Sequence, residues 1–231
     1  MKVLTYLLIL AIASCSSNKD LPDSNKHKVQ EITIVEDQKQ APAADRTTPR
    51  ENLSEAVFAS GCFWCVEAIF ESVAGVDEAV SGYAGGLSKN ANYSAVSAGK
   101  TNHAEAVKVY YDADVISYQT LLEVFFGSHD PTTLNKQGPD AGRQYRSAIF
   151  YANSTEEATA RAYIQQLENE KVFDGSITTT LEPLDRFHIA EDYHQDYERR
   201  NPNQPYVRGV SVPRLNAFKK RYPHLLKPND H

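Results

Sequence analysis

A strand, a glycine turn and a helix follow one another without interruption at residues 56–73, and they constrain the fold more than any other segment. The apolar run 56–59 predicts a buried strand, and apolar residues recur at helical spacing across 63–73. Gly61 supplies the tight turn between the two, so Cys62 falls at the start of the helix. Amides at a helix N-terminus and the helix dipole favour a thiolate, so the segment predicts a reactive cysteine.

A second cysteine, Cys65, lies three residues after Cys62, and the only tryptophan of the chain, Trp64, lies between them. Cys-x-x-Cys where a strand meets a helix is a geometry of redox proteins, and a buried structural cysteine is the alternative interpretation. Two cysteines cannot form a four-cysteine zinc site, so we expect no structural metal.

The first 14 residues predict a signal peptide. Lys2 supplies a positive charge, and the apolar run 3–12 is too short to span a bilayer. The run ends in Ile12-Ala13-Ser14-Cys15, which resembles the lipobox of bacterial lipoproteins, and an ordinary signal peptide with an incidental cysteine is the alternative. We therefore expect a lipoprotein signal peptide at 1–14 and lipid on Cys15. The protein would then be anchored to a bacterial membrane in the cell envelope, facing the periplasm or the exterior.

Residues 15–52 predict a disordered tether, because they are polar and mixed in charge, contain prolines and have few aromatic residues. The formal net charge of the chain is -6 and no long basic run is present, which argues against binding of nucleic acid. We expect the remaining residues, 53–231, to form a single domain and the protein to be a monomer.

Within 53–231, strands are expected at 55–59, 76–81, 103–112, 147–152 and 177–184, and helices at 63–73, 116–126, 154–170, 190–200 and 213–226. Gly75 is expected to end the first helix, and Ser117 and Ser154 to cap later ones, Ser154 in a capping box with Glu157. The order strand–helix–strand–strand–helix–strand predicts an α+β fold. We expect a two-layer split βαβ (ferredoxin-like) sandwich with a coil-rich C-terminal region. Two long polar loops, 87–102 and 129–146, are expected to carry function.

Gly61-Cys62-Phe63-Trp64 at the start of a helix resembles the active-site signature of the peptide methionine sulfoxide reductase A family. Further matching stretches are Gly82-Tyr83-Ala84-Gly85-Gly86, Asn92-Tyr93, His103-Ala104-Glu105-Ala106-Val107, His129 to Asp140, Gln144-Tyr145-Arg146-Ser147 and Ala190-Glu191-Asp192-Tyr193-His194-Gln195. The resemblance covers about 53–202. It implies an oxidoreductase that reduces methionine S-sulfoxide, in proteins and in free form, to methionine. It also implies a thioredoxin-like reductant and no metal, flavin or nucleotide cofactor.

The resemblance implies that Cys62 attacks the sulfoxide sulfur and becomes a sulfenic acid, while Glu105 protonates the oxygen. Glu105 shares a strand face with Val107 and Val109, where burial would raise the pKa of a carboxyl group. Taken alone, the residue pattern favours an exposed charge at the end of a strand for Glu105, and the resemblance reverses this interpretation.

Further site residues also follow from the resemblance. Tyr93 and Tyr145 would bond the sulfoxide oxygen, and Asp140 would hold a water or the polar part of the substrate near the site. Phe63 and Trp64 would form an apolar pocket for the substrate's ε-methyl group. Without the resemblance, packing roles and a loop turn would account for these residues.

The chain departs from the family at Cys65, where many members have glycine, and no cysteine lies within 202–231. The sulfenic acid on Cys62 would be resolved by Cys65, by an external thiol or by the reductant directly, and Cys65 is the candidate resolving residue. Two other hypotheses remain: a thioredoxin-type thiol–disulfide oxidoreductase, and a lipid-anchored binding or structural module with an inert cysteine pair.

Overall fold

A computed structural model describes residues 50–87 and 91–228. The predicted signal peptide, the predicted lipidation site Cys15 and nearly all of the predicted tether lie outside the described residues. Among the described residues, no helix is both long and apolar enough to cross a membrane.

A six-stranded sheet forms the centre of the fold, in the order β7-β6-β1-β3-β2-β8. The strands are β1 (Ser54–Ser60), β2 (Val76–Ala84), β3 (Ala104–Tyr111), β6 (Ser147–Tyr151), β7 (Thr180–Pro183) and β8 (His188–Ile189). All neighbours pair antiparallel except β6 and β7, which are parallel. The four central strands, β6-β1-β3-β2, have the order of a split βαβ unit, so the predicted fold class is confirmed.

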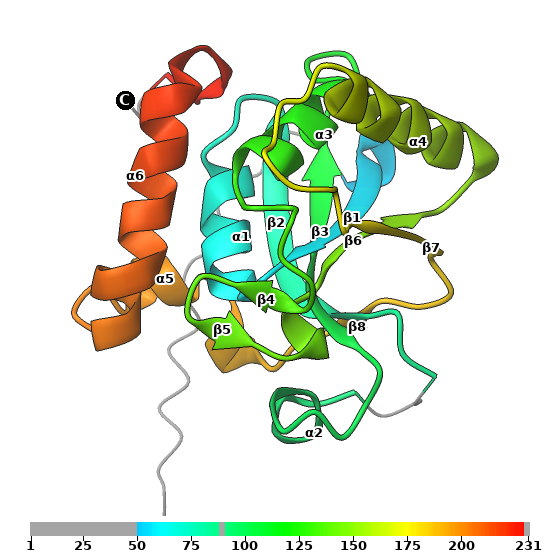
Figure 1. The fold of residues 1–231 in the computed structure, drawn as a ribbon. Coiled ribbons are helices and arrows are strands. Elements are labelled where there is room, and N and C mark those ends of the chain that lie inside the picture. The colour runs from blue at the N-terminus through cyan, green and yellow to red at the C-terminus, as the bar shows by residue number, and fades with distance from the viewer. Residues whose placement is uncertain (1–49, 88–90, 229–231) are drawn as a thin grey trace, which may run out of the picture. The chain divides into compact units, whose positions relative to one another are not determined.

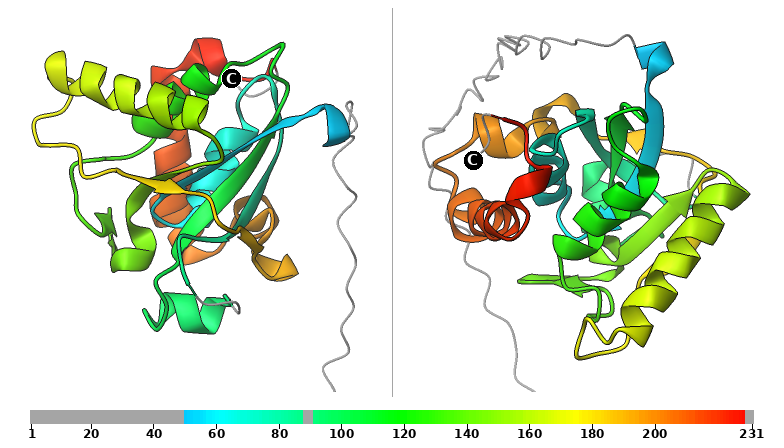
Figure 2. Two further views of the ribbon diagram at one scale, coloured as in Figure 1. Left: turned by 90° about the vertical axis from the view of Figure 1, so that its right-hand side faces the viewer. Right: turned by 90° about the horizontal axis from the view of Figure 1, so that it is seen from above.

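The helices are α1 (Phe63–Glu71), α2 (Tyr93–Ser97), α3 (Tyr118–Gly127), α4 (Ser154–Asn169), α5 (Tyr197–Arg200) and α6 (Val212–Arg221). Buried side chains of α1, α3, α4 and α6 join those of one sheet face in a single core. Figures 1 and 2 show α1, α3 and α4 beside the sheet and α6 on the far side of α1. The opposite face buries a smaller cluster that includes Val57, Ala59 and Phe150, against which Leu184 and Phe187 pack. Alternate residues of β1 thus enter different cores, as strand geometry requires.

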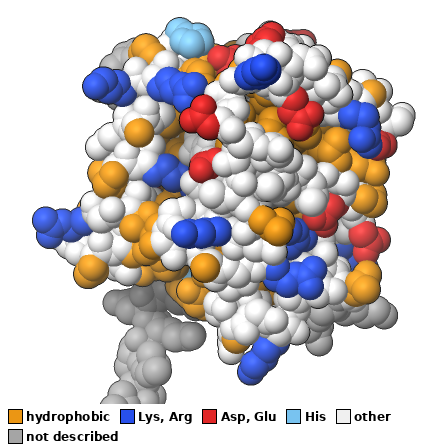
Figure 3. Space-filling view, viewed as in Figure 1, with side chains coloured by type: hydrophobic (Ala, Val, Ile, Leu, Met, Phe, Trp, Pro, Cys, Tyr) orange, Lys and Arg blue, Asp and Glu red, His pale blue; other side chains and the backbone are white. Residues whose placement is uncertain are grey.

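Surface charge is mixed on the face of the molecule that Figure 3 shows. Acidic side chains lie toward the top and the right of this view, and basic side chains lie among them and also along the left edge and the bottom. The second long loop forms a small hairpin of β4 (Lys136–Gln137) and β5 (Asp140–Ala141), which lies beside the N-terminal end of α1 in Figure 1.

Several predicted boundaries require correction. The first helix ends at Glu71 rather than at residue 73, and the chain turns at Gly75 with a φ of 85°. The fourth helix is capped by Asn153 rather than by Ser154. The Asn153 side chain accepts the Glu156 N–H at 2.9 Å, and the Glu156 side chain accepts the N–H of Ala152, the residue before the cap, so the reciprocal bonds begin one residue earlier than predicted. The Ser117 cap is confirmed, because its side chain accepts the Thr120 N–H at 3.0 Å.

The prediction of a continuous helix at 190–200 is wrong in its first part. Only Asp192–His194 and Tyr197–Arg200 form short helical turns, because Gln195 is extended and Asp196 adopts a left-handed φ of 54°. The Gln195 side chain bonds both the N–H and the C=O of Ser81, at 3.0 Å each, which fixes the segment to β2. Tertiary hydrogen bonds therefore override the helical pattern. The last predicted strand shortens to Thr180–Pro183.

Candidate active site

Cys62 occupies the N-cap position of α1 and is buried, with 6% of its surface exposed. Gly61 makes the turn that places it there, with a φ of 95° that side chains other than glycine rarely adopt. A Cβ at Gly61 would lie 2.7 Å from the Cβ of Gln137, so the β4–β5 hairpin can approach only because this residue is glycine. The amide of Trp64 donates to the Cys62 sulfur, which favours the thiolate.

One cavity is lined by all seven residues predicted to act on or bind the substrate: Cys62, Phe63, Trp64, Tyr93, Glu105, Asp140 and Tyr145. They come from α1, α2, β3, β5 and the turn at Arg143–Tyr145. Gln204 and Tyr206 also line this cavity and were not predicted. They lie directly after Asn201-Pro202, and the proline-flanked stretch 201–206 is the sequence signal that could have identified them.

Glu105 is 2% exposed, so the alternative of an exposed charge at the end of a strand is wrong. The backbone N–H of Phe63 donates to Glu105 Oε2 at 3.1 Å, which ties the carboxyl to the residue following Cys62. Burial raises the pKa of Glu105 to about 8, although the Phe63 hydrogen bond acts in the opposite direction. The carboxyl therefore keeps its proton at neutral pH.

The two tyrosines predicted from the long loops lie next to the thiol and the acid. Burial raises the pKa of Tyr93 to about 12, with the charges of Glu105 and Cys62 adding to the effect, and the same causes raise that of Tyr145. Both hydroxyls therefore remain protonated donors at neutral pH. The Tyr93 N–H donates to Glu191 Oε1 at 2.9 Å, which fixes the start of α2 to the C-terminal segment.

Trp64 is held in place by residues of the C-terminal segment. Its ring stacks on Tyr197 with a centroid distance of 3.7 Å, and its Nε1–H donates to His194 Nδ1 at 3.0 Å. Phe63 is fully buried and packs against Trp64 and Tyr83. The two aromatic residues of the Cys-x-x-Cys segment thus form apolar walls of the cavity.

Cys65 is 1% exposed, and its sulfur hydrogen-bonds with the Cys62 thiol. The bond with Cys62, the Arg214 cation and hydrogen-bonding contacts with the hydroxyls of Ser211 and Tyr206 lower the pKa of Cys65 to about 7, although burial acts in the opposite direction. Burial and the same thiol–thiol bond raise the pKa of Cys62. The pair is unoxidised, and the Cys62 thiol donates to Cys65.

Asp140 contacts the same group of residues. Its carboxylate accepts the Tyr206 hydroxyl hydrogen, and burial raises the pKa of Asp140 while this bond and Arg214 lower it. The Arg214 side chain donates to the carbonyl of Ser128 at 2.7 Å, so the cation is held close to Cys65.

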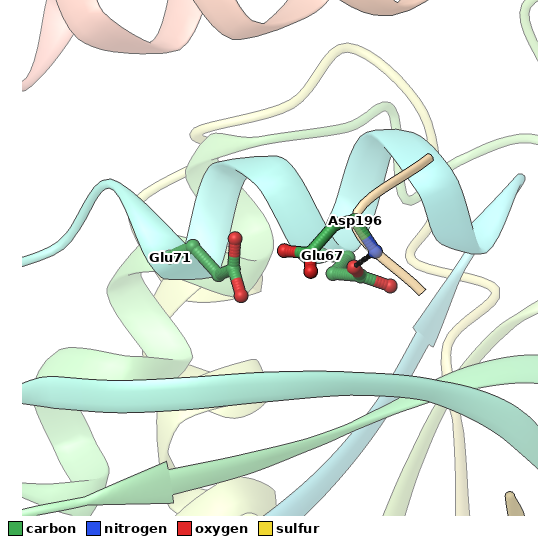
Figure 4. Close-up of side chains that lie close together, drawn as sticks. All are labelled: Glu67, Glu71 and Asp196. Carbon is green, nitrogen blue, oxygen red and sulfur yellow. Dashed lines mark hydrogen bonds between the residues drawn. The ribbon is translucent and has the colours of Figure 1, made fainter. Parts of the chain in front are cut away.

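Three carboxylates, Glu67, Glu71 and Asp196, gather along α1 outside this cavity, with oxygens within 4.8 Å of one another (Figure 4). Within the described part of the chain they are the one group with enough ligand atoms for a metal ion. Both oxygens of Glu67 already accept hydrogen bonds, from Ser81 and from the N–H of Asp196. Burial raises the pKa of Glu67 to about 8 and that of Glu71 to about 7.

A family model of peptide methionine sulfoxide reductase matches residues 54–225. The chain belongs to this family. The reductase MsrA 2 of Synechocystis sp. is 48% identical over 182 residues, which are 78% of this chain and 85% of that protein. MsrA of Chromobacterium violaceum is 47% identical over 175 residues, 76% of this chain and 99% of the relative.

Solved structures of the family agree with the fold. Methionine sulfoxide reductase A of Corynebacterium diphtheriae aligns with a TM-score of 0.61 and 33% identity, over 71% of this chain and 82% of that one. Reduced Mxr1 of Saccharomyces cerevisiae gives a TM-score of 0.60 at 32% identity, over 67% and 88%. The protein is therefore a methionine sulfoxide reductase of the MsrA type, an oxidoreductase.

Proposed function

We propose that this reductase converts the S epimer of methionine sulfoxide, in proteins and in free form, to methionine by direct attack of Cys62 on sulfur. The observation that carries the proposal is the meeting of a buried thiol, a protonated carboxyl and two tyrosine hydroxyls at one cavity. A sulfoxide needs these partners, because its sulfur accepts a nucleophile only as its oxygen accepts a proton.

Substrate binding would use the groups that line the cavity. The S-methyl group lies against Phe63 and Trp64, and the oxygen accepts hydrogen bonds from Tyr93 and Tyr145. Asp140, bonded to Tyr206, holds a water or the polar part of the substrate. In this pose the sulfur faces Cys62 and the oxygen faces Glu105.

The reaction transfers the oxygen from the substrate sulfur to the sulfur of Cys62. The Cys62 thiolate forms a bond to the substrate sulfur while Glu105 gives its proton to the oxygen. The hydroxyl group then passes to the Cys62 sulfur, and the substrate S–O bond and the bond between the two sulfurs break, which leaves a sulfenic acid on Cys62. The substrate leaves as the thioether methionine, and Glu105 is left ionised. Cys62 is oxidised and the methionine sulfur is reduced.

Cys65 would resolve the sulfenic acid. Its thiolate attacks the Cys62 sulfur and forms a disulfide, while the oxygen leaves as hydroxide and becomes water. Cys65 already hydrogen-bonds with Cys62, and it is the other cysteine among the described residues. A thioredoxin-like dithiol would then reduce the disulfide.

We further propose that lipid on Cys15 and the tether 15–52 anchor the enzyme at a membrane of the cell envelope, where it repairs oxidised proteins. The lipobox-like Ile12-Ala13-Ser14-Cys15 supports this localisation. A Cys15→Ala variant should move from the membrane fraction to the soluble fraction. Retention of the variant in the membrane would contradict lipid anchoring.

The catalytic proposal is tested with a methionine-sulfoxide peptide resolved into its two epimers. The wild type should consume the S epimer alone, and Cys62→Ser should consume neither. Cys65→Ser should release about one methionine per protein and then stall with thioredoxin as reductant. Equal activity of wild type and Cys62→Ser would refute the role of Cys62, and unchanged steady-state rates of Cys65→Ser would refute that of Cys65.

A further inference from the structure

Cys65 is sealed from solvent, so a proton that leaves its thiol has to pass through neighbouring groups of the protein. Besides Cys62, its sulfur hydrogen-bonds with the hydroxyls of Tyr206 and Ser211. Ser211 is itself fully buried, in the π-helical turn Val207–Ser211 that precedes α6. Its hydroxyl donates to Oε2 of Glu198 on α5.

Glu198 extends this chain of contacts to the surface. It is partly exposed and lines a surface pocket together with Arg199 and Lys219, apart from the cavity at Cys62. A continuous path of hydrogen bonds therefore connects the buried thiol, through one serine hydroxyl, to a carboxylate that reaches solvent.

We propose that Glu198 accepts the proton of Cys65 through Ser211 when the Cys62–Cys65 disulfide forms. This inference rests on the resolving role proposed above for Cys65, and it adds two relay residues that contact neither the substrate nor the reacting oxygen.

The chemistry of the serine hydroxyl supports a relay. A hydroxyl has one hydrogen and two acceptor lone pairs. While Ser211 donates to Glu198, a lone pair stays free to accept from the Cys65 thiol, so one concerted shift moves a proton from sulfur to carboxylate. Tyr206 offers a poorer route, because its hydroxyl donates to Asp140, which lines the cavity that the substrate fills.

The charges around both ends favour the transfer. Cys65 is faced by Cys62, Tyr206, Ser211 and the Arg214 cation of α6, and the cation stabilises the thiolate that remains. Glu198 is faced by Ser211 and the Lys219 cation, which oppose the rise in pKa that burial of Glu198 causes. A carboxyl with a raised pKa matches a thiol better than an ordinary glutamate does, which lowers the cost of the transfer.

The relay fits the whole cycle. The Cys62 thiol donates to Cys65, so its proton moves to Cys65 as Cys62 attacks the sulfoxide. Cys65 is then a neutral thiol next to a sulfenic acid, and it must lose that proton to act. Ser211 passes the proton to Glu198, the thiolate forms the S–S bond, and hydroxide leaves Cys62. Glu198 releases its proton to solvent, and the hydroxide takes up one proton to become water.

The test separates the two chemical steps in the full-length protein. Reduced enzyme is mixed with one equivalent of the S-epimer peptide and quenched at intervals. Methionine release reports the attack by Cys62, and loss of free thiols reports disulfide formation. The variants are Glu198→Gln, Ser211→Ala, their double variant and Ser211→Thr, which restores a hydroxyl. Glu168→Gln on α4 is the matched control, because it removes an exposed carboxylate far along the sequence from either cysteine.

We expect Glu198→Gln and Ser211→Ala each to slow disulfide formation by about tenfold while methionine release keeps its rate. The double variant should be no slower than either single variant, since both interrupt one path. Ser211→Thr should recover most of the rate, and the pH dependence of disulfide formation in the wild type should be lost in Glu198→Gln.

Wild-type disulfide rates and pH profile in Glu198→Gln would overturn the relay. Equal slowing of methionine release and disulfide formation would also overturn it, because that result indicates a structural role. Hydrogen peroxide, which oxidises Cys62 without a sulfoxide, serves as a second oxidant. With hydrogen peroxide, the rate of disulfide formation can be measured even in a protein that releases no methionine from the sulfoxide peptide. A failure to release methionine would therefore contradict the proposed function and leave the relay testable.

Discussion

Replacing Glu105 by glutamine should remove the catalytic acid while keeping the fold. Glutamine has the same shape, and its carbonyl can still accept the Phe63 N–H that Glu105 Oε2 accepts at 3.1 Å. The proton for the sulfoxide oxygen is lost, and general acids contribute about 10²–10⁴-fold to such reactions. We therefore expect kcat/KM to fall by at least about 100-fold.

The pH profile should change as well. With its pKa raised to about 8 by burial, Glu105 is protonated below that pH and ionised above it. Wild-type activity should fall as the pH rises through about 8, whereas the weak activity of Glu105→Gln should lack this decline.

The Glu105→Gln substitution should affect stability in the opposite direction to activity. Glu105 binds a proton more tightly in the folded protein than in the unfolded chain, so its burial destabilises the protein as the pH rises from 4.5 to about 8. That interval corresponds to a loss of roughly 5 kcal/mol in the free energy of unfolding. Glu105→Gln escapes the loss, so its stability relative to wild type should improve with pH.

The assays are initial rates with the S-epimer peptide and urea unfolding, both followed across this pH range. Glu67→Gln is the control. Like Glu105, Glu67 is buried and has a pKa raised to about 8, but it lies on α1 and does not line the cavity. It should alter the stability profile and keep the alkaline decline in activity. Activity of Glu105→Gln within about threefold of wild type, or an unchanged decline near pH 8, would refute the assignment of the acid.

Other substitutions test the walls and the turn of the site. Tyr93→Phe and Tyr145→Phe each remove one hydroxyl near Cys62 and Glu105, so each should lower kcat by about 10- to 100-fold with less effect on KM in steady-state assays. Trp64→Phe loses the 3.0 Å hydrogen bond to His194 and part of the stacking on Tyr197, so KM should rise roughly several-fold. An unchanged KM would exclude Trp64 from substrate binding. Gly61→Ala would place a Cβ 2.7 Å from that of Gln137 at a left-handed φ, so thermal unfolding should show a loss of about 1–3 kcal/mol.

The fold could be predicted from the sequence largely because its central strands and helices have simple patterns. The apolar run 56–59 and the alternation around Val107 and Val109 reflect burial on the sheet, which sequence periodicity records directly. The segment 190–200 could not be predicted in the same way. Its conformation depends on hydrogen bonds to Ser81 and on stacking with Trp64, and both partners lie more than 100 residues away.

In the candidate site, too, some residues could be predicted from local patterns, whereas others depend on tertiary contacts. Cys62 and its position at the start of α1 follow from the local turn, and the family resemblance located the other residues that line the cavity except Gln204 and Tyr206. The sequence alone does not connect Tyr206, Ser211 and Arg214 with Cys65. Their contacts with Cys65 exist only because α6 packs against α1, which is a tertiary event without a local pattern.

The central claim is that Cys62 takes the oxygen of the substrate. The most direct measurement is mass analysis of the Cys62 peptide in Cys65→Ser, after reaction with one equivalent of each epimer and capture of sulfenic acid by a 1,3-diketone. Capture at Cys62 should match methionine release one to one with the S epimer and be absent with the R epimer. Methionine release without capture at Cys62 would contradict the mechanism.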